Sequence, residues 1–326
     1  MIFNKFITLL ALVMTYTLAL AGQLTPEQQA AKLRGITLYN QYKAISAEPF
    51  LKVAAEAGDH EAQYYLGEAI RLNKRYMTAE AEKWYTAAAD QGDYYAMYRL
   101  SGKGSDLCAA MGNCPKGQKS AGDWLLQGRE TAKALAEKGD VEAMYVLHFL
   151  TNDDTWLEKS VAGGYPIAQW YLATQYKEGE GFFLFPWNRS ARIKELFKQS
   201  AEGGYPMAMF AHAGAFQKEG DLKSSQIWLK KGAETGYESM FGDYAYSLSD
   251  PNNRWGLETD YVKSYGLMSL ILELNGGGNV LEFTQETLKK IATHLTPEQI
   301  EQAKKISAEW KATHPPLSFF PGKLGY

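Results

Sequence analysis

The chain has 326 residues, a formal net charge of −3 at pH 7, and no long run of like charges. This length is enough for one sizeable core or for two ordinary domains. The slightly acidic balance gives no electrostatic basis for binding nucleic acid, so no nucleic-acid partner is expected.

Residues 1–21 have the layout of a secretory signal peptide. Lys5 precedes an apolar stretch over residues 6–20, and Ala19-Leu20-Ala21 forms a small-x-small cleavage pattern before Gly22. The stretch is short for a transmembrane helix with polar flanks, although an uncleaved anchor is the alternative. We therefore expect an exported protein that starts near Gly22 and does not span a membrane.

The chain contains two cysteines, Cys108 and Cys114, six residues apart. In an oxidising compartment, such a pair is expected to form a disulfide across a small loop. Free thiols or a metal site are the alternatives, but the five histidines are scattered along the chain. The sequence thus predicts a disulfide and no metal site.

A repeated pattern runs through the middle of the chain. Six glycines recur in an A-x-x-G or V-x-x-G context: Gly58, Gly92, Gly139, Gly164, Gly204 and Gly236. Four residues after the glycine, alanine occurs in five of six copies; six residues after it, an aromatic residue occurs in five of six. Such agreement between columns indicates a structural repeat.

Each copy is predicted to be two amphipathic helices joined by a tight turn. Glycine can adopt the left-handed conformation that ends a helix, and Pro166 and Pro206 suit the first turn of the next helix. The alanine lets two backbones approach, while the aromatic residues fill the space between units. One helix pair cannot bury both faces, so the units must stack.

The pattern A-E-x-G-D/Y-x-x-A-x-Y-x-L, together with Y-K-E-G-E-G at residues 176–181, resembles the Sel1-like repeats, relatives of the tetratricopeptide repeats. This resemblance covers roughly residues 40–310 and implies an all-α, right-handed α-solenoid of stacked antiparallel helix pairs. Residues 294–310 resemble the helix that caps such arrays. The implied organisation is a solenoid over 22–312, including a degenerate unit and cap at 260–311, followed by a tail over 313–326.

The spacing of the repeat is uneven. Gly139 follows Gly92 by 47 residues, and this long spacing includes the cysteine-containing insertion over residues 101–124. Gly164 follows Gly139 by only 25 residues, which indicates a shortened unit and leaves the register there open.

No catalytic motif is present. The sequence has no G-x-S-x-G elbow, no H-E-x-x-H and no phosphate-binding G-x-x-x-x-G-K-[ST]. His212 lies eight residues after Gly204, at a position that is leucine in four other copies, and His148 directly follows one of these leucines. Both positions favour a packing role. We expect a protein that is not an enzyme and has no cofactor.

Three departures from the repeat are candidates for contact with a partner: the cysteine insertion, the apolar run within residues 179–188, and the tail. The run either tucks beneath a neighbouring unit or stands exposed, and the tail either packs back on the last unit or forms a contact arm. The proposed contact residues are Phe182, Phe183, Phe185, Trp187, Phe319 and Phe320.

An exported Sel1-like protein of this size is similar to the periplasmic immunity proteins that neutralise phospholipase effectors of type VI secretion. The resemblance implies a protein partner, namely a lipase or phospholipase toxin that is blocked sterically, and a monomer when free. The alternative is a periplasmic Sel1-like adaptor that assembles an envelope complex.

Overall fold

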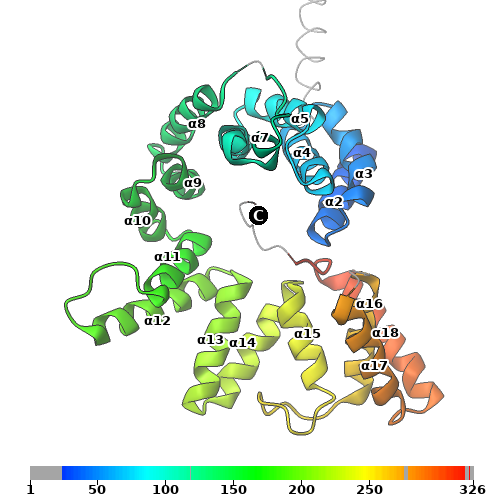
Figure 1. The fold of residues 1–326 in the computed structure, drawn as a ribbon. Coiled ribbons are helices and arrows are strands. Elements are labelled where there is room, and N and C mark those ends of the chain that lie inside the picture. The colour runs from blue at the N-terminus through cyan, green and yellow to red at the C-terminus, as the bar shows by residue number, and fades with distance from the viewer. Residues whose placement is uncertain (1–23, 118, 275–277, 320–322, 324–326) are drawn as a thin grey trace, which may run out of the picture. The chain divides into compact units, whose positions relative to one another are not determined.

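The computed structural model describes residues 24–117, 119–274, 278–319 and 323. The predicted signal peptide therefore lies outside the described residues. Within these ranges the regular secondary structure is helical, apart from one bridge between Tyr237 and Ser318 (Figure 1). The predicted all-α solenoid of paired helices is confirmed. Two compact units are distinguished, one containing Lys43–Gln127 and the described residues up to Tyr39, the other Asn40–Tyr42 and the chain from Gly128 onward.

The first unit consists of short helices in chain order. They are α2 (Pro26–Asn40), α3 (Ala44–Glu56), α4 (His60–Lys74), α5 (Ala79–Asp90), α6 (Tyr94–Ser101), the 3₁₀ turn η1 (Gly102–Ser105), α7 (Leu107–Ala110) and the start of α8 (Ala121–Ala136). Neighbours in sequence pack on one another: α3 on α4, α4 on α5, and α5 on α6. These are the first repeats of the sequence pattern.

The second unit continues the series. It contains the rest of α8, then α9 (Val141–Thr151), α10 (Asp154–Ala162), α11 (Pro166–Glu178), α12 (Pro186–Glu202), α13 (Pro206–Glu219), α14 (Leu222–Glu234), α15 (Glu238–Ser247), α16 (Tyr261–Leu274), α17 (Gly278–Ala292) and α18 (Pro297–Thr313). Consecutive helices from α9 to α17 again pack on one another, and α18 packs on α16.

The turn glycines all adopt the predicted left-handed conformation, with φ between +78° and +94°. At five of the six turns the next helix begins in one of two ways, and after Gly236 an uncapped Tyr237 is followed by Glu238 instead. Asp59, Asp93 and Asp140 each accept a hydrogen bond from the N–H of the alanine three residues on, at 2.7 to 2.9 Å. After Gly164 and Gly204 a tyrosine without a side-chain cap is followed by proline as the first helical residue.

The conserved columns of the repeat form the packed core. The five alanines four residues after the glycine are fully buried: Ala62, Ala96, Ala143, Ala168 and Ala208. Met240 replaces alanine in the last copy and is also fully buried, because it lies in the space beside Gly232, where even a β-carbon would clash with it. The larger residue is thus matched by a smaller one on the preceding helix.

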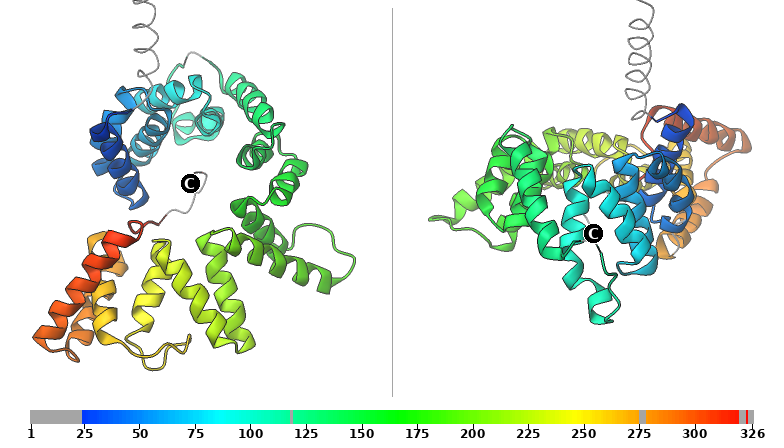
Figure 2. Two further views of the ribbon diagram at one scale, coloured as in Figure 1. Left: turned by 180° about the vertical axis from the view of Figure 1, so that it is seen from behind. Right: turned by 90° about the horizontal axis from the view of Figure 1, so that it is seen from above.

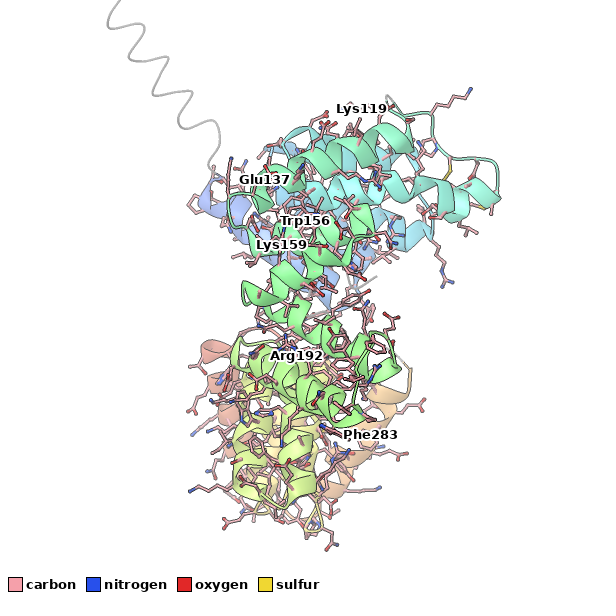
Figure 3. All side chains as sticks on the ribbon, turned by 90° about the vertical axis from the view of Figure 1, so that its left-hand side faces the viewer. Lys119, Glu137, Trp156, Lys159, Arg192 and Phe283 are labelled. Atoms are coloured by element: carbon pink, nitrogen blue, oxygen red, sulfur yellow. A yellow bond between two sulfur atoms is a disulfide. The ribbon has the colours of Figure 1, made fainter. Side chains whose placement is uncertain are left out.

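Lysine side chains cover the outer faces of two partly buried tryptophans in the column eight residues before the glycine. Lys159 Nζ lies 4.0 Å from the ring centroid of Trp156 (both labelled in Figure 3), and Lys231 Nζ lies 4.7 Å from that of Trp228. Each lysine follows its tryptophan by three residues, so the two share one helix face. This pairing shields the aromatic ring while keeping the surface polar.

The shortened unit between Gly139 and Gly164 is a complete helix pair. The left-handed residue Asn152, with φ of +56°, ends α9, and the nine-residue α10 follows almost immediately. This resolves the register that the spacing left open.

The C-terminal part differs in two respects from the repeat pattern. α18 matches the predicted capping helix and begins with a Thr296–Gln299 capping box, but the pattern did not predict α17 before it. After α18 the tail returns to the last turn: Ser318 N–H donates to the carbonyl of Gly236 at 2.8 Å, and Glu238 N–H donates to the carbonyl of Ser318 at 2.9 Å. Of its two possible placements, the described tail therefore packs back.

Candidate functional site

The apolar run of residues 182–187 lies in the connection between α11 and α12. Exposed fractions are 89% for Phe182, 73% for Leu184 and 65% for Trp187, and Phe185 is 43% exposed. The connection bows away from the ends of both helices in Figure 1, and it projects in the view from behind in Figure 2. Of the two placements that the sequence allowed, the structure shows the exposed one. We call Phe182, Leu184, Phe185 and Trp187 the aromatic patch.

Arg189, in the first turn of α12, holds this connection in shape. Its Nη1 donates to the carbonyl oxygens of Tyr176 at 2.9 Å and Glu180 at 2.6 Å, and its Nη2 donates to that of Gly181 at 2.7 Å. One guanidinium group thereby satisfies three backbone acceptors that end α11 and begin the loop. These three hydrogen bonds join the loop to the helices on either side of it.

Phe183 faces inward, unlike its neighbours. Its ring meets the ring of Tyr176 edge-on, with centroids 4.9 Å apart, and the Arg189 guanidinium lies 4.8 Å from its centroid. Gly181, with φ of +73°, lies so close to Tyr176 that a β-carbon there would be 2.8 Å from the ring. Phe183 is therefore the internal anchor of the loop, and its three aromatic neighbours are the exposed members.

Phe185 and Trp187 form a stacked pair, with ring centroids 4.6 Å apart and ring planes inclined by 10°. Pro186 lies between them as the first residue of α12, so its fixed φ restricts the backbone that carries both rings. A rigid, flat aromatic surface of this kind loses little conformational entropy when it is covered.

Exposure of several large apolar side chains on one ordered loop is unfavourable in water and is typical of a contact surface. Tryptophan and other aromatic residues contribute most of the binding energy in many protein interfaces. The geometry thus provides clustered anchors of the type that interfaces use.

The cysteine insertion forms a second exposed feature, in the first unit. Cys108 and Cys114 are joined by a disulfide, with their Cα atoms 4.7 Å apart. Asp106 fixes the start of α7 by accepting from Cys108 N–H at 3.0 Å and from Met77 N–H at 2.8 Å. Leu107, the first residue of α7, and Met111, which directly follows this helix, are about half exposed.

The tail residues differ from the loop residues. Phe319 is partly buried against the hydrophobic core of the second unit, which includes Leu317. Phe320 lies outside the described residues. Of the six contact residues proposed from sequence, Phe182, Phe185 and Trp187 are therefore exposed, while Phe183 and Phe319 are partly buried.

The histidines singled out by sequence lie in packed surroundings. His148 is buried beside Phe149 and Tyr171, and its Nδ1 lies 3.4 Å from a carboxylate oxygen of Asp154. His212 packs against Trp228, at a centroid distance of 4.9 Å, and burial lowers the pKa of His212. The described residues contain no group of three His, Cys, Asp or Glu side chains arranged to hold a metal ion.

A buried ionic cluster in the first unit was not predicted. Glu68 is fully buried and accepts hydrogen bonds from Tyr39 at 3.0 Å, Tyr85 at 2.6 Å and Arg99 Nε at 2.6 Å. Burial, reinforced by the charge of Glu68, raises the pKa of Tyr85 well above its usual value, so both tyrosines remain donors. The sequence did contain one signal for this cluster. Glu68 follows Tyr64 by four residues and Tyr65 by three, which places a glutamate beside aromatic residues on a helix that is mostly buried.

No helix in the described part of the chain combines the length and the hydropathy needed to cross a bilayer.

Comparison with known proteins gives matches among solved structures only. No family model matches the chain, and no curated protein matches it. A protective antigen with an SLR fold from uropathogenic Escherichia coli is 20% identical, with a TM-score of 0.45; the match covers 89% of this chain and 62% of that one. This chain thus spans under two thirds of the antigen's length.

Two further solved structures are similar. A Sel1 repeat protein from Oxalobacter formigenes is 20% identical, with a TM-score of 0.39, and the match covers 86% of each chain. An immunity protein from Pseudomonas aeruginosa is 13% identical, with a TM-score of 0.41; the match covers 71% of this chain and 81% of that one.

Proposed function

We propose that this protein is a non-enzymatic binding protein of the periplasm that recognises a protein partner through the aromatic patch. The observation that carries the proposal is the exposure of Phe182, Leu184 and Trp187 on a loop that Arg189 already holds in place. Such pre-organised aromatic anchors are suited to binding because little order must be created on association.

The partner that we propose is a lipase or phospholipase effector of type VI secretion, which makes the protein an immunity protein. A lipase acts on lipid and must present apolar surface around its active-site mouth, and the exposed rings of the aromatic patch are complementary to such a surface. Covering that surface blocks access of lipid sterically, without chemistry by the inhibitor. A stable complex of this kind buries about 1,600 Å² or more in total.

Export to the periplasm is proposed on two grounds. Residues 1–21 have the pattern of a signal peptide, and Cys108 and Cys114 form a disulfide, which persists in oxidising compartments.

The experiment compares inhibition of a phospholipase encoded next to this gene by the wild-type protein and by the triple variant Phe182→Ser, Leu184→Ser, Trp187→Ser. Loss of two or more hot-spot side chains should weaken binding at least about 100-fold. The melting temperature should stay the same, because these side chains are exposed.

The control replaces two other apolar residues that are more than half exposed, Ile45→Ser with Leu126→Ser. This control should inhibit as well as the wild type. If the wild-type protein neither binds the phospholipase nor rescues cells that express it in the periplasm, the immunity function is wrong. If the triple variant binds normally, the partner uses another surface.

A further inference from the structure

A pocket of about 470 Å³ lies in the second unit, between α15, α16 and the first turns of α17. Its walls are largely apolar and include Tyr246, Met268, Ile271, Val280 and Phe283. Two of these are aromatic: the rings of Tyr246 and Phe283 have centroids 5.4 Å apart, and both are exposed at the rim (Phe283 is labelled in Figure 3). The aromatic patch is not part of this pocket.

One carboxylate in the pocket lacks a cation. Glu238, the first residue of α15, lines the pocket, and the ion pairs of the described residues include none to its carboxylate. Asp243, which also lines it, differs: its Oδ2 accepts from Arg254 Nη2 at 2.7 Å and from Trp255 Nε1 at 3.0 Å. Burial raises the pKa of Glu238, in accord with a carboxylate removed from water and not compensated by a positive charge.

Apolar walls around a carboxylate without a cation restrict the kind of group that can bind in this pocket. The Ser239 side chain gives the Glu238 carboxylate a hydrogen bond but no positive charge. A purely apolar occupant would complete the burial of this carboxylate without supplying that charge, which is costly. An anion would be repelled. A metal ion needs several ligands, and the described residues provide no such group here.

A lysine or arginine side chain can interact with the apolar walls, the carboxylate and the aromatic rim of the pocket. Its methylene stem packs on Met268 and Ile271, and its charged end pairs with Glu238. The faces of Tyr246 and Phe283 at the rim attract the same cation.

We propose that this pocket binds an arginine or lysine side chain presented by a protein partner, as a contact site separate from the aromatic patch. The assignment concerns the pocket alone and does not depend on which partner the aromatic patch binds.

The test measures binding of small probes to the purified protein, labelled with ¹³C at the methionine methyl groups. The signal of Met268, assigned by its loss in Met268→Leu, reports occupancy of the pocket. The probes are n-butylguanidinium and its neutral isostere n-butylurea. We expect the cation to bind at least about tenfold more tightly than the urea in the wild type.

The variant Glu238→Gln should remove this preference, so that both probes bind with the same weak affinity. The matched control Glu286→Gln changes an exposed carboxylate on α17 outside the pocket and should leave the preference intact. If n-butylurea binds as tightly as n-butylguanidinium to the wild type, or if Glu238→Gln keeps the preference, the proposal is wrong.

A second variant keeps the test decisive if Glu238→Gln fails to fold. Phe283 is 52% exposed, so Phe283→Ala should fold normally and lower the affinity for n-butylguanidinium several-fold. An unchanged affinity in this variant would overturn the role of the rim. Failure of phospholipase binding in the experiment above would not alter either result.

Discussion

The Arg189 guanidinium and the Tyr176 carbonyl close the base of the α11–α12 loop, with Nη1 donating at 2.9 Å to the oxygen near the end of α11. The same guanidinium lies over Phe183, the ring that points inward from the loop. Order in the aromatic patch therefore depends on a residue outside the apolar run, and this dependence can be tested apart from any partner.

Arg189→Ala should loosen the loop while leaving the helices intact. Loss of three hydrogen bonds from a charged donor should lower the free energy of opening the loop by about 2 kcal/mol. The population of the open loop should then be roughly 30-fold larger. Chymotrypsin should then cut within residues 182–187 much faster than in the wild type. Arg192→Ala, a change of the same type one turn further along α12, should not increase the cleavage rate; equal cleavage in both variants would contradict the anchoring role.

Glu68→Ala should strongly destabilise the first unit. The change leaves the mostly buried Arg99 guanidinium and the Tyr39 and Tyr85 hydroxyl groups without their shared acceptor, at a cost of about 3–5 kcal/mol. Urea unfolding followed by circular dichroism measures this loss. In contrast, Glu56→Ala removes only an exposed pair with Lys52 and should change the free energy of unfolding by about 0.5 kcal/mol or less.

Two glycines in helices should respond oppositely to alanine. At Gly266 on α16 a β-carbon would lie 2.5 Å from the carbonyl oxygen of Ala303 on α18, so Gly266→Ala should cost about 1–3 kcal/mol by separating the two helices. A β-carbon added at Gly214 on α13 would meet no atom within 4 Å apart from its chain neighbours and the backbone of its own helix, so Gly214→Ala should stabilise by about 0.5–1 kcal/mol. Thermal unfolding distinguishes the two, and a stabilising Gly266→Ala would show that α18 does not pack closely on α16.

His212 should make part of the stability depend on pH. Because burial lowers the pKa of His212 in the folded protein, the unfolded chain binds a proton first as the pH falls below about 6.5. Stability from this group is therefore lost between about pH 6.5 and the lowered folded pKa, and does not change above that window. His212→Leu should reduce the slope of unfolding free energy against pH there; an unchanged slope would show that other groups cause it.

The parts of the fold that the sequence predicted are those fixed by local chemistry. The left-handed glycine, the proline in the first turn of the next helix and the small alanine all lie within a few residues of one another, so the helix pairs could be read directly from the repeat. The capping helix before Thr313 followed from resemblance. Even the shortened unit needed only Asn152, a residue that tolerates a left-handed conformation, to end α9.

The features that were missed depend on contacts distant in sequence. The Glu68 cluster joins α2, α4, α5 and α6, and the Glu238 pocket needs three helices, of which α17 does not follow the repeat. Exposure of the aromatic run could not be inferred from its composition, since a buried loop has the same residues. Its decisive contact is Arg189, whose acceptors lie 8 to 13 residues earlier in the chain.

The return of the tail to the last turn has a practical meaning for anyone who shortens this chain. The repeat pattern ends with the capping helix, so a deletion after Thr313 looks harmless. Such a deletion would remove the Ser318 backbone, which bonds to the Gly236 carbonyl and the Glu238 N–H. These two groups lie at the start of α15, and Glu238, its first residue, lines the pocket described above. The folding boundary of this protein therefore extends at least five residues beyond its last helix, to Ser318.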